Sequence, residues 1–74
     1  MQAVEDLVAR LFGAEGVDDD SSPETVEGWD SMGHLNLVLA LERDYQVSIA
    51  VADVVEMVSV KRIKDVLRGY GVGL

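Results

Sequence analysis

The segment that decides the fold is Trp29-Asp30-Ser31-Met32-Gly33-His34-Leu35, where a polar region meets the start of the most apolar helix in the chain. Asp and Ser both commonly cap helix N-termini, because their side-chain oxygens accept hydrogen bonds from the free N–H groups of the first turn. Ser31 in this place can cap the helix, attack a substrate or carry a covalent group. The residues on either side decide between these roles.

The N-terminal side of this segment predicts one amphipathic helix and a long loop. Apolar residues recur with helical spacing at Val4, Leu7, Val8, Leu11 and Phe12. Gly13 is the residue type that commonly ends such a helix in the left-handed conformation. Residues 14–30 are rich in Asp, Ser and Gly and contain one proline, which predicts a loop. The residues expected to anchor this loop are Val17, Val26 and Trp29.

The second predicted helix runs from Ser31 to about Tyr45 and is apolar over much of its circumference. One stripe consists of Leu37, Val38, Leu41 and Tyr45, and a second beside it consists of Met32, Leu35 and Leu39. A helix with such a broad apolar surface is central to the fold or shares one face with a partner.

The C-terminal part predicts a short helix and a longer one. Residues 47–49 alternate like a strand, but a single strand has nothing to pair with, so we expect a loop there. A short helix is expected near Ala52 to Met57, and Ser59 can cap a last helix. The residues expected on one face of that helix are Val60, Ile63, Leu67 and Tyr70. The prediction is an all-α fold in a single domain over residues 1–74, a small bundle of three main helices plus one short helix.

The composition excludes several classes of protein. The chain has 74 residues, 49% of them hydrophobic, and no cysteine, so one modest core must form without disulfides or thiolate metal sites. A net charge of -8 argues against nucleic-acid binding and favours a partner with a basic surface. The acidic run at 18–20 lacks the ligand spacing and glycine of an EF-hand loop, so we expect no metal site. No segment predicts a membrane span or a signal peptide, and a soluble cytoplasmic protein is expected.

A catalytic serine does not fit the residues around Ser31. Gly28 and Gly33 are one residue out of register for a Gly-x-Ser-x-Gly elbow, and no strand precedes them. His34, the only histidine, lies one turn along the same helix with no third residue to orient it, and is expected at the surface. We therefore expect no enzyme and no catalytic residues. Gly33 either leaves room for a bulky group on Ser31 or is simply tolerated in a first turn.

The sequence resembles the acyl carrier proteins over essentially its whole length. The resemblance rests on Asp30-Ser31-Met32 at the start of a leucine-rich helix, followed by Leu39-Ala40-Leu41-Glu42 and Tyr45. In that family a transferase esterifies the serine with 4'-phosphopantetheine from coenzyme A, and the thiol of this arm carries an acyl group as a thioester. The resemblance implies that Ser31 is the attachment residue.

The resemblance also implies how partners dock. The implied partners are a phosphopantetheinyl transferase, an acyl-loading enzyme, and a ketosynthase or acyltransferase, all meeting a monomeric carrier. The residues implied to contact them are Asp30, Met32, Leu35, Leu39, Glu42 and Asp44. Core packing is the alternative for the apolar members of this set. Gly33, Asn36 and Arg43 stand where the family often has carboxylates, which makes this helix a poorer match to enzymes of housekeeping fatty-acid synthesis.

The sequence is compatible with several interpretations of the kind of carrier. Residues 29–37, with Trp before Asp-Ser-Met-Gly-His, look like discrete carriers of polyketide and other secondary-metabolite pathways, including antibiotic biosynthesis. Similar Asp-Ser-Met-Gly sequences occur in D-alanyl carrier proteins, so an aminoacyl carrier is the alternative. Peptidyl carriers usually have a glycine before the serine that is absent here. An acidic helical interaction module without a prosthetic group is the alternative from a different class.

Overall fold

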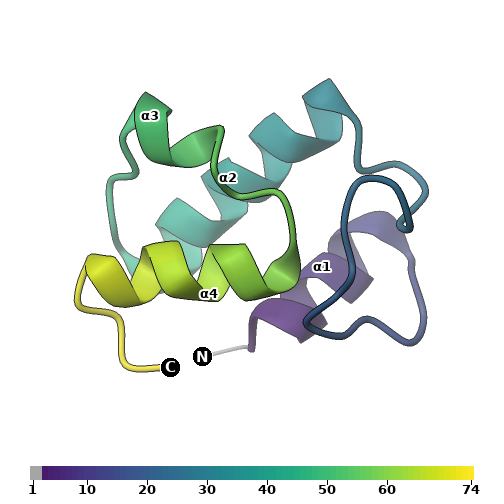
Figure 1. Cartoon of the computed structure of the whole chain (residues 1–74), viewed down its shortest axis with the longest axis horizontal. Helices are drawn as coiled ribbons and strands as arrows, with labels where there is room; N and C mark the ends of the chain where they lie inside the picture. Colours follow the sequence, from purple (N-terminus) through teal and green to yellow (C-terminus); the bar gives the residue numbers. More distant parts are fainter. Residues whose placement is uncertain (1–2) are drawn as a thin grey trace.

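The computed structural model describes residues 3–74, which form four helices and no strand (Figure 1). The all-α fold with three main helices and one short one is confirmed. The helices are α1 (Val4–Phe12), α2 (Ser31–Tyr45), α3 (Val51–Val54) and α4 (Val60–Gly69). None of them is both long enough and apolar enough to cross a lipid bilayer.

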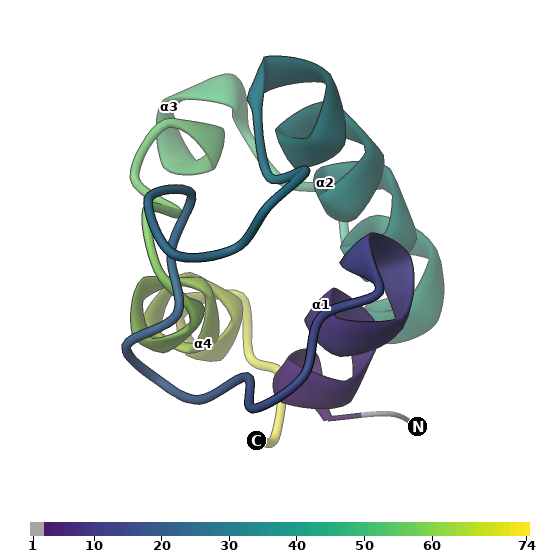
Figure 2. The same ribbon diagram turned by 90° about the vertical axis from the view of Figure 1, so that its right-hand side faces the viewer.

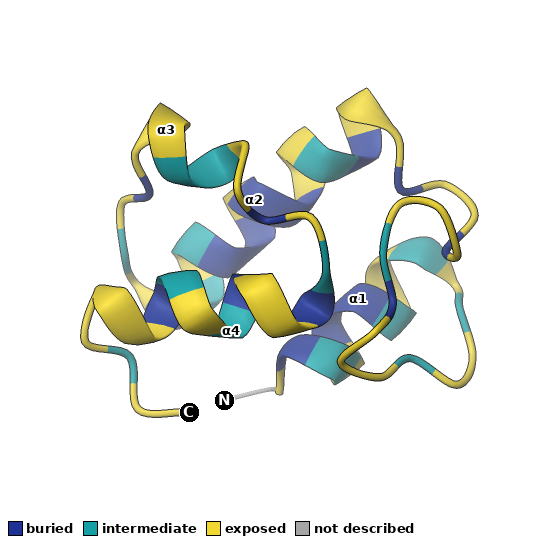
Figure 3. Cartoon of the chain, viewed as in Figure 1, coloured by how far each residue is buried: buried dark blue, intermediate teal, exposed yellow. Residues whose placement is uncertain are grey.

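The core lies between α1, α2 and α4, because each of these helices turns one apolar stripe inward (Figure 3). The side chains of Val8, Leu37, Leu41, Ile63 and Leu67 are completely buried there. The faces that point away from this core are mostly exposed, as expected for amphipathic helices packed around one centre.

The two apolar stripes predicted on α2 have different surroundings. The stripe that contains Leu37 and Leu41 is buried in the core. The other stripe is open to solvent, with exposed fractions of 68% for Met32, 54% for Leu35 and 63% for Leu39. Core packing therefore does not explain the second stripe, and α2 keeps an unpartnered apolar face within the described chain.

The predicted bounds of the short helix were wrong. Helix α3 covers Val51–Val54 rather than Ala52 to Met57, since the chain turns after Val54. This turn directs Met57 into the core, where it is completely buried. The end of α3 thus coincides with the return of the chain to the core at Met57.

Tyr70 was also misplaced in the prediction. Helix α4 ends at Gly69, and Tyr70 follows it with 37% of its surface exposed rather than buried on the inner face. Its hydroxyl oxygen accepts a hydrogen bond from the N–H of Ala50 at 2.9 Å, and the hydroxyl donates to the carboxylate of Asp53. Tyr70 thus joins the end of α4 to the start of α3.

The loop between α1 and α2 is held down at several points. Trp29 and Val26 are buried and Val17 is half-buried against the core, so these three residues anchor the loop as predicted. The loop also crosses to the start of α4 (Figure 2). There the carbonyl oxygen of Ser21 accepts from the N–H of Val60 at 2.9 Å. This path returns the chain to the beginning of α2 in a fixed position.

Candidate functional site

The N-terminus of α2 is capped by Asp30 and not by Ser31. Asp30 has an extended backbone, and its Oδ1 accepts a hydrogen bond from the N–H of Gly33 at 2.8 Å. Ser31 is the first residue of the helix and is exposed. Its hydroxyl has no hydrogen-bond partner among residues 3–74. The cap and the serine have separate roles, which leaves the Ser31 oxygen accessible from solvent.

His34 lies beside this helix start with both ring nitrogens engaged. The indole N–H of Trp29 donates to Nδ1 of His34 at 2.9 Å, so the proton of the neutral ring is on Nε2. Nε2 in turn donates to the carbonyl oxygen of Val54 at 2.9 Å. The expectation that His34 is a plain surface residue was wrong, because its ring is half-buried and links three segments. Sequence spacing contains no signal for this, since Trp29 and Val54 both lie outside α2.

The same hydrogen bonds exclude His34 as a general base that could deprotonate the Ser31 hydroxyl. A general base must lie within hydrogen-bond reach of the proton that it takes, and the hydrogen bonds of the His34 ring go to Trp29 and Val54 instead. No third residue orients the ring toward Ser31 within the described chain. The site displays a hydroxyl but does not activate it.

Gly33 is buried, and neither role predicted for it from the sequence, room for a bulky group or simple tolerance in a first turn, explains this. A Cβ built at this position would collide with the carbonyl oxygen of Gly28 and would lie 2.8 Å from Cε1 of Phe12. The space beside Gly33 is therefore filled by the chain itself and offers no room for a group on Ser31. Glycine is needed here because the loop before α2 packs directly on the first turn.

Aromatic stacking reinforces this contact between the loop and α2. The rings of Phe12 and Trp29 are stacked with centroids 5.8 Å apart, and the rings of Trp29 and His34 are stacked at 6.2 Å. Trp29 is only 2% exposed. The residue two positions before Ser31 is thus fixed from both sides, which fixes the position of the serine.

An apolar groove of about 610 Å³ lies next to Ser31. One side is formed by Trp29 and by the first turns of α2, including Ser31 and Leu35, and the other by Val55 and Val58 after α3. Both valines are more than half exposed. A group attached to the Ser31 oxygen would therefore meet an apolar surface.

The residues expected to contact partners lie along α2 from Ser31 onward. Met32, Leu35 and Leu39 share the exposed apolar face, and Asp30 stands at its beginning. The carboxylate of Glu42 accepts the N–H of Ile49 at 2.8 Å and is half-buried.

Asp44, the last of the expected partner residues, is also half-buried. Its Oδ1 lies 3.6 Å from Nε of Arg43. Each carboxylate near the end of α2 therefore has an intramolecular contact, in addition to any role toward a partner.

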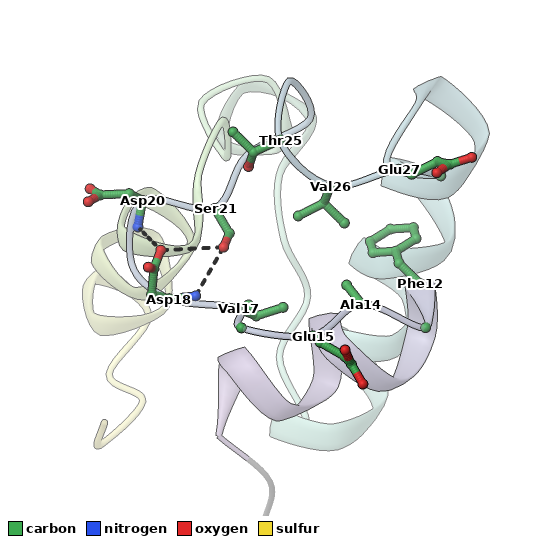
Figure 4. Close-up of a pocket in the computed structure, with 13 residues that line it drawn as sticks. Phe12, Ala14, Glu15, Val17, Asp18, Asp20, Ser21, Thr25, Val26 and Glu27 are labelled. Atoms are coloured by element: carbon green, nitrogen blue, oxygen red, sulfur yellow. Dashed lines mark hydrogen bonds between the residues drawn. The ribbon is translucent and has the colours of Figure 1, made fainter.

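A larger hollow, of about 790 Å³, lies away from Ser31 between the end of α1 and residues 13–28 (Figure 4). Its carboxylates are spread around the rim, and that of Asp18 accepts hydrogen bonds from the N–H of Asp20 and the hydroxyl of Ser21. Over residues 3–74, no group of three side chains is arranged to hold a metal ion. The hollow belongs to the internal structure of the loop.

The shortest ion pairs found over residues 3–74 are those of Lys64 on α4. Its Nζ lies 2.8 Å from Oε2 of Glu5 and 2.6 Å from Oδ1 of Asp19. The hydrogen bonds to Lys64 lower the pKa of both carboxyl groups from their ordinary values. They also raise the pKa of Lys64. These contacts join α1, the loop and α4, and so help to hold the loop that leads to Ser31.

A small helical bundle that displays an unactivated serine at the start of its central helix has the form of a carrier domain. Residues 2–67 match the family described as the phosphopantetheine attachment site, and the chain therefore belongs to this family. It is a non-catalytic carrier with an acyl-carrier-like fold, and its prosthetic group is 4'-phosphopantetheine. Comparison with curated proteins gives no match.

The site fits this group. An exposed serine hydroxyl without a partner in the described chain can form the phosphodiester, and the free N–H groups of a helix start favour an anion. The group supplies a terminal thiol, which this cysteine-free chain lacks.

Proposed function

We propose that Ser31 carries the 4'-phosphopantetheine arm and that the protein presents an acyl group, bound to the arm as a thioester, to biosynthetic enzymes. The observation that carries this proposal is the division of roles at the start of α2. Asp30 makes the capping hydrogen bond, and the Ser31 hydroxyl is left exposed at the positive end of a helix dipole.

The other hydroxyl side chains support this choice because most of them are engaged. The hydroxyl of Ser21 is bonded within the loop, and that of Ser22 donates to Glu24 at 2.8 Å. Ser59 caps α4, since its oxygen accepts from the N–H of Arg62. Ser48 is exposed but lies in the connection before α3, where no helix begins. It therefore provides a matched control.

The exposed apolar stripe of α2 supports a docking role for its residues. Met32, Leu35 and Leu39 form a face that starts beside Ser31, so an enzyme that binds there would have the arm within reach. We propose that this face, with Asp30 at its start and the acidic residues Glu42 and Asp44 toward its end, contacts the phosphopantetheinyl transferase, the loading enzyme, and a ketosynthase or acyltransferase.

The proposal also names the biosynthetic pathway and the form in which the carrier acts. The sequence around Ser31 favours a carrier in polyketide or other secondary-metabolite biosynthesis over one of housekeeping fatty-acid synthesis. Asn36 and Arg43 are exposed on α2 at positions where the family often has carboxylates, so this helix offers less negative charge to the enzymes of fatty-acid synthesis. The proposal further takes this carrier to be a discrete monomer in the cytoplasm.

Mass spectrometry of the intact protein tests the attachment. After incubation with coenzyme A and a broad-specificity transferase, the chain should gain the mass of one arm. Ser31→Ala should gain none, and Ser48→Ala should gain the same mass as the unaltered chain. Loading of Ser31→Ala, or no loading of the unaltered chain by a transferase that modifies another carrier, would overturn the proposal. The mass of a thioester trapped on the native protein then separates an acyl from an aminoacyl cargo.

A further inference from the structure

Helix α3 is unusual in this molecule because no residue of it is buried. Its four residues, Val51–Val54, are all exposed or half-exposed. In this segment the chain is buried only at its flanks, at Ile49 and at Met57, and within the helix only Val54 packs partly against the core. Apolar burial therefore fixes the two ends of this segment more firmly than the helix between them.

Two side chains from outside α3, one after α4 and one on α2, attach it further through hydrogen bonds. At the start of α3, the Tyr70 hydroxyl oxygen accepts the N–H of Ala50. At its end, the carbonyl oxygen of Val54 accepts from Nε2 of His34 at 2.9 Å and from the N–H of Met57 at 3.3 Å. The last carbonyls of a helix lack intrahelical partners, so the Val54 oxygen is available to accept both of these bonds from outside the helix.

The ring of His34 is held in the orientation that this bond requires. The indole N–H of Trp29 donates to Nδ1, which forces the proton of the neutral ring onto Nε2 and directs it toward Val54. Trp29 cannot easily rotate away, because its ring is almost completely buried and stacked on Phe12. The chain of hydrogen bonds from Trp29 through His34 to Val54 thus starts in the core and ends on α3.

This chain of hydrogen bonds runs along the wall of the groove beside Ser31, since both Trp29 and His34 line it. His34 itself lines the groove, Leu35 lies on the α2 side, and Val55 and Val58 lie on the side that follows α3. We propose that His34 is a positioning residue, which holds α3 against the first turns of α2 and thereby sets the width of the groove. That this groove receives the group on Ser31 rests on the proposed function, but the link between His34 and α3 does not.

The test compares three variants of the unmodified chain by NMR hydrogen exchange. His34→Phe keeps a stacked ring but removes both hydrogen bonds, whereas His34→Gln keeps one acceptor and one donor. Asn36→Ala changes an exposed residue of the same helix and serves as the control. The reporters are the amides of residues 55–58 and the indole N–H of Trp29, the only tryptophan in the chain.

We expect exchange at these sites to be about tenfold faster in His34→Phe, the change for a loss of about 1.4 kcal/mol in local stability. His34→Gln should restore much of the protection and Asn36→Ala should change nothing. The amides of Leu37 and Leu41 in the core should be affected far less than those after α3. Unchanged exchange at residues 55–58 in His34→Phe, or equal acceleration at α2 and α3, would overturn the proposal.

The outcome is independent of whether Ser31 is modified, since every sample is unmodified. If the chain gained no arm, the proposed function would be refuted, whereas the proposed link between His34 and α3 would be unaffected. If the exchange rates did not change as expected, the role of His34 would be refuted, whereas the proposed attachment at Ser31 would be unaffected.

Discussion

Replacing Gly33 by alanine should destabilise the protein, although alanine is the better helix former. Propensity alone would favour Gly33→Ala by up to about 1 kcal/mol. The new methyl group, however, would collide with the carbonyl oxygen of Gly28 and lie 2.8 Å from Cε1 of Phe12. Adding a methyl group to a packed site costs about 1–3 kcal/mol.

The upper end of this range applies, because neither neighbour can move without cost. The carbonyl of Gly28 is part of the backbone, and Gly28 has a φ of 91° that holds it in a tight turn. The ring of Phe12 is stacked on buried Trp29. A cost of about 3 kcal/mol less a gain of about 1 kcal/mol leaves a net loss of about 2 kcal/mol. For a domain of this size, that corresponds to a fall in Tm of roughly 10 °C.

Urea unfolding followed by Trp29 fluorescence measures this loss, and Gly69→Ala is the matched control. Gly69 is also in a helix, but a Cβ there meets no atom within 4 Å. We expect Gly69→Ala to be neutral or to gain up to about 1 kcal/mol. If Gly33→Ala were as stable as Gly69→Ala, the packing of Gly28 on the first turn would not be the reason for this glycine.

Two further predictions concern the helix start and the ionic contacts. Asp30→Ala should lower the free energy of unfolding by about 1 kcal/mol, whereas Ser31→Ala should cost clearly less, because the capping bond is made by Asp30. Lys64 lowers the pKa of Glu5 and of Asp19 below the ordinary values of 4.5 and 3.8. The two ionised carboxylates therefore stabilise the fold fully above these ordinary values, and this stabilisation is lost as the pH falls through the lowered pKa values. Lys64→Met should therefore be less stable at about pH 7, and its stability should decrease less steeply on acidification to about pH 3.

Urea midpoints measured across this range of pH test the second prediction. Lys61→Met removes the same charge from an exposed residue of α4 that makes no ion pair within residues 3–74. Lys61 lowers the pKa of Asp19 only through a weaker charge attraction than Lys64, so this variant should keep most of the steep acid dependence. Equal slopes for the unaltered chain and Lys64→Met would refute the assignment to this cluster. For the cap, an equal loss of stability in Asp30→Ala and Ser31→Ala would show that both residues contribute to it.

The sequence predicts the three long helices well because burial alone determines them. The spacing of Leu37 and Leu41, or of Ile63 and Leu67, requires a helix whatever its neighbours are, and these residues are completely buried. Periodicity does not single out Ser31, and its proposed role rests on the Asp-Ser pair before an apolar helix together with the resemblance to acyl carrier proteins. Periodicity is informative where one face of an element is the core.

Features that depend on polar contacts between distant segments could not be predicted in this way. The end of α3 is set by Met57 and by the bond from His34 to Val54, which connects residues twenty positions apart. Tyr70 fits the helical period of α4 but lies beyond the helix end and contacts Ala50. Gly33 was ambiguous because the carbonyl that requires it comes from the preceding loop. Each of these contacts depends on the tertiary fold.

The capping arrangement at the start of α2 has a consequence for the life cycle of a carrier. Because Asp30 alone supplies the capping acceptor, esterifying the Ser31 oxygen breaks no hydrogen bond of the described fold. Unmodified, modified and loaded forms should then share one backbone conformation at the helix start. An enzyme that acts early and one that acts late in a reaction sequence would meet the same protein surface and distinguish the forms by the attached group alone.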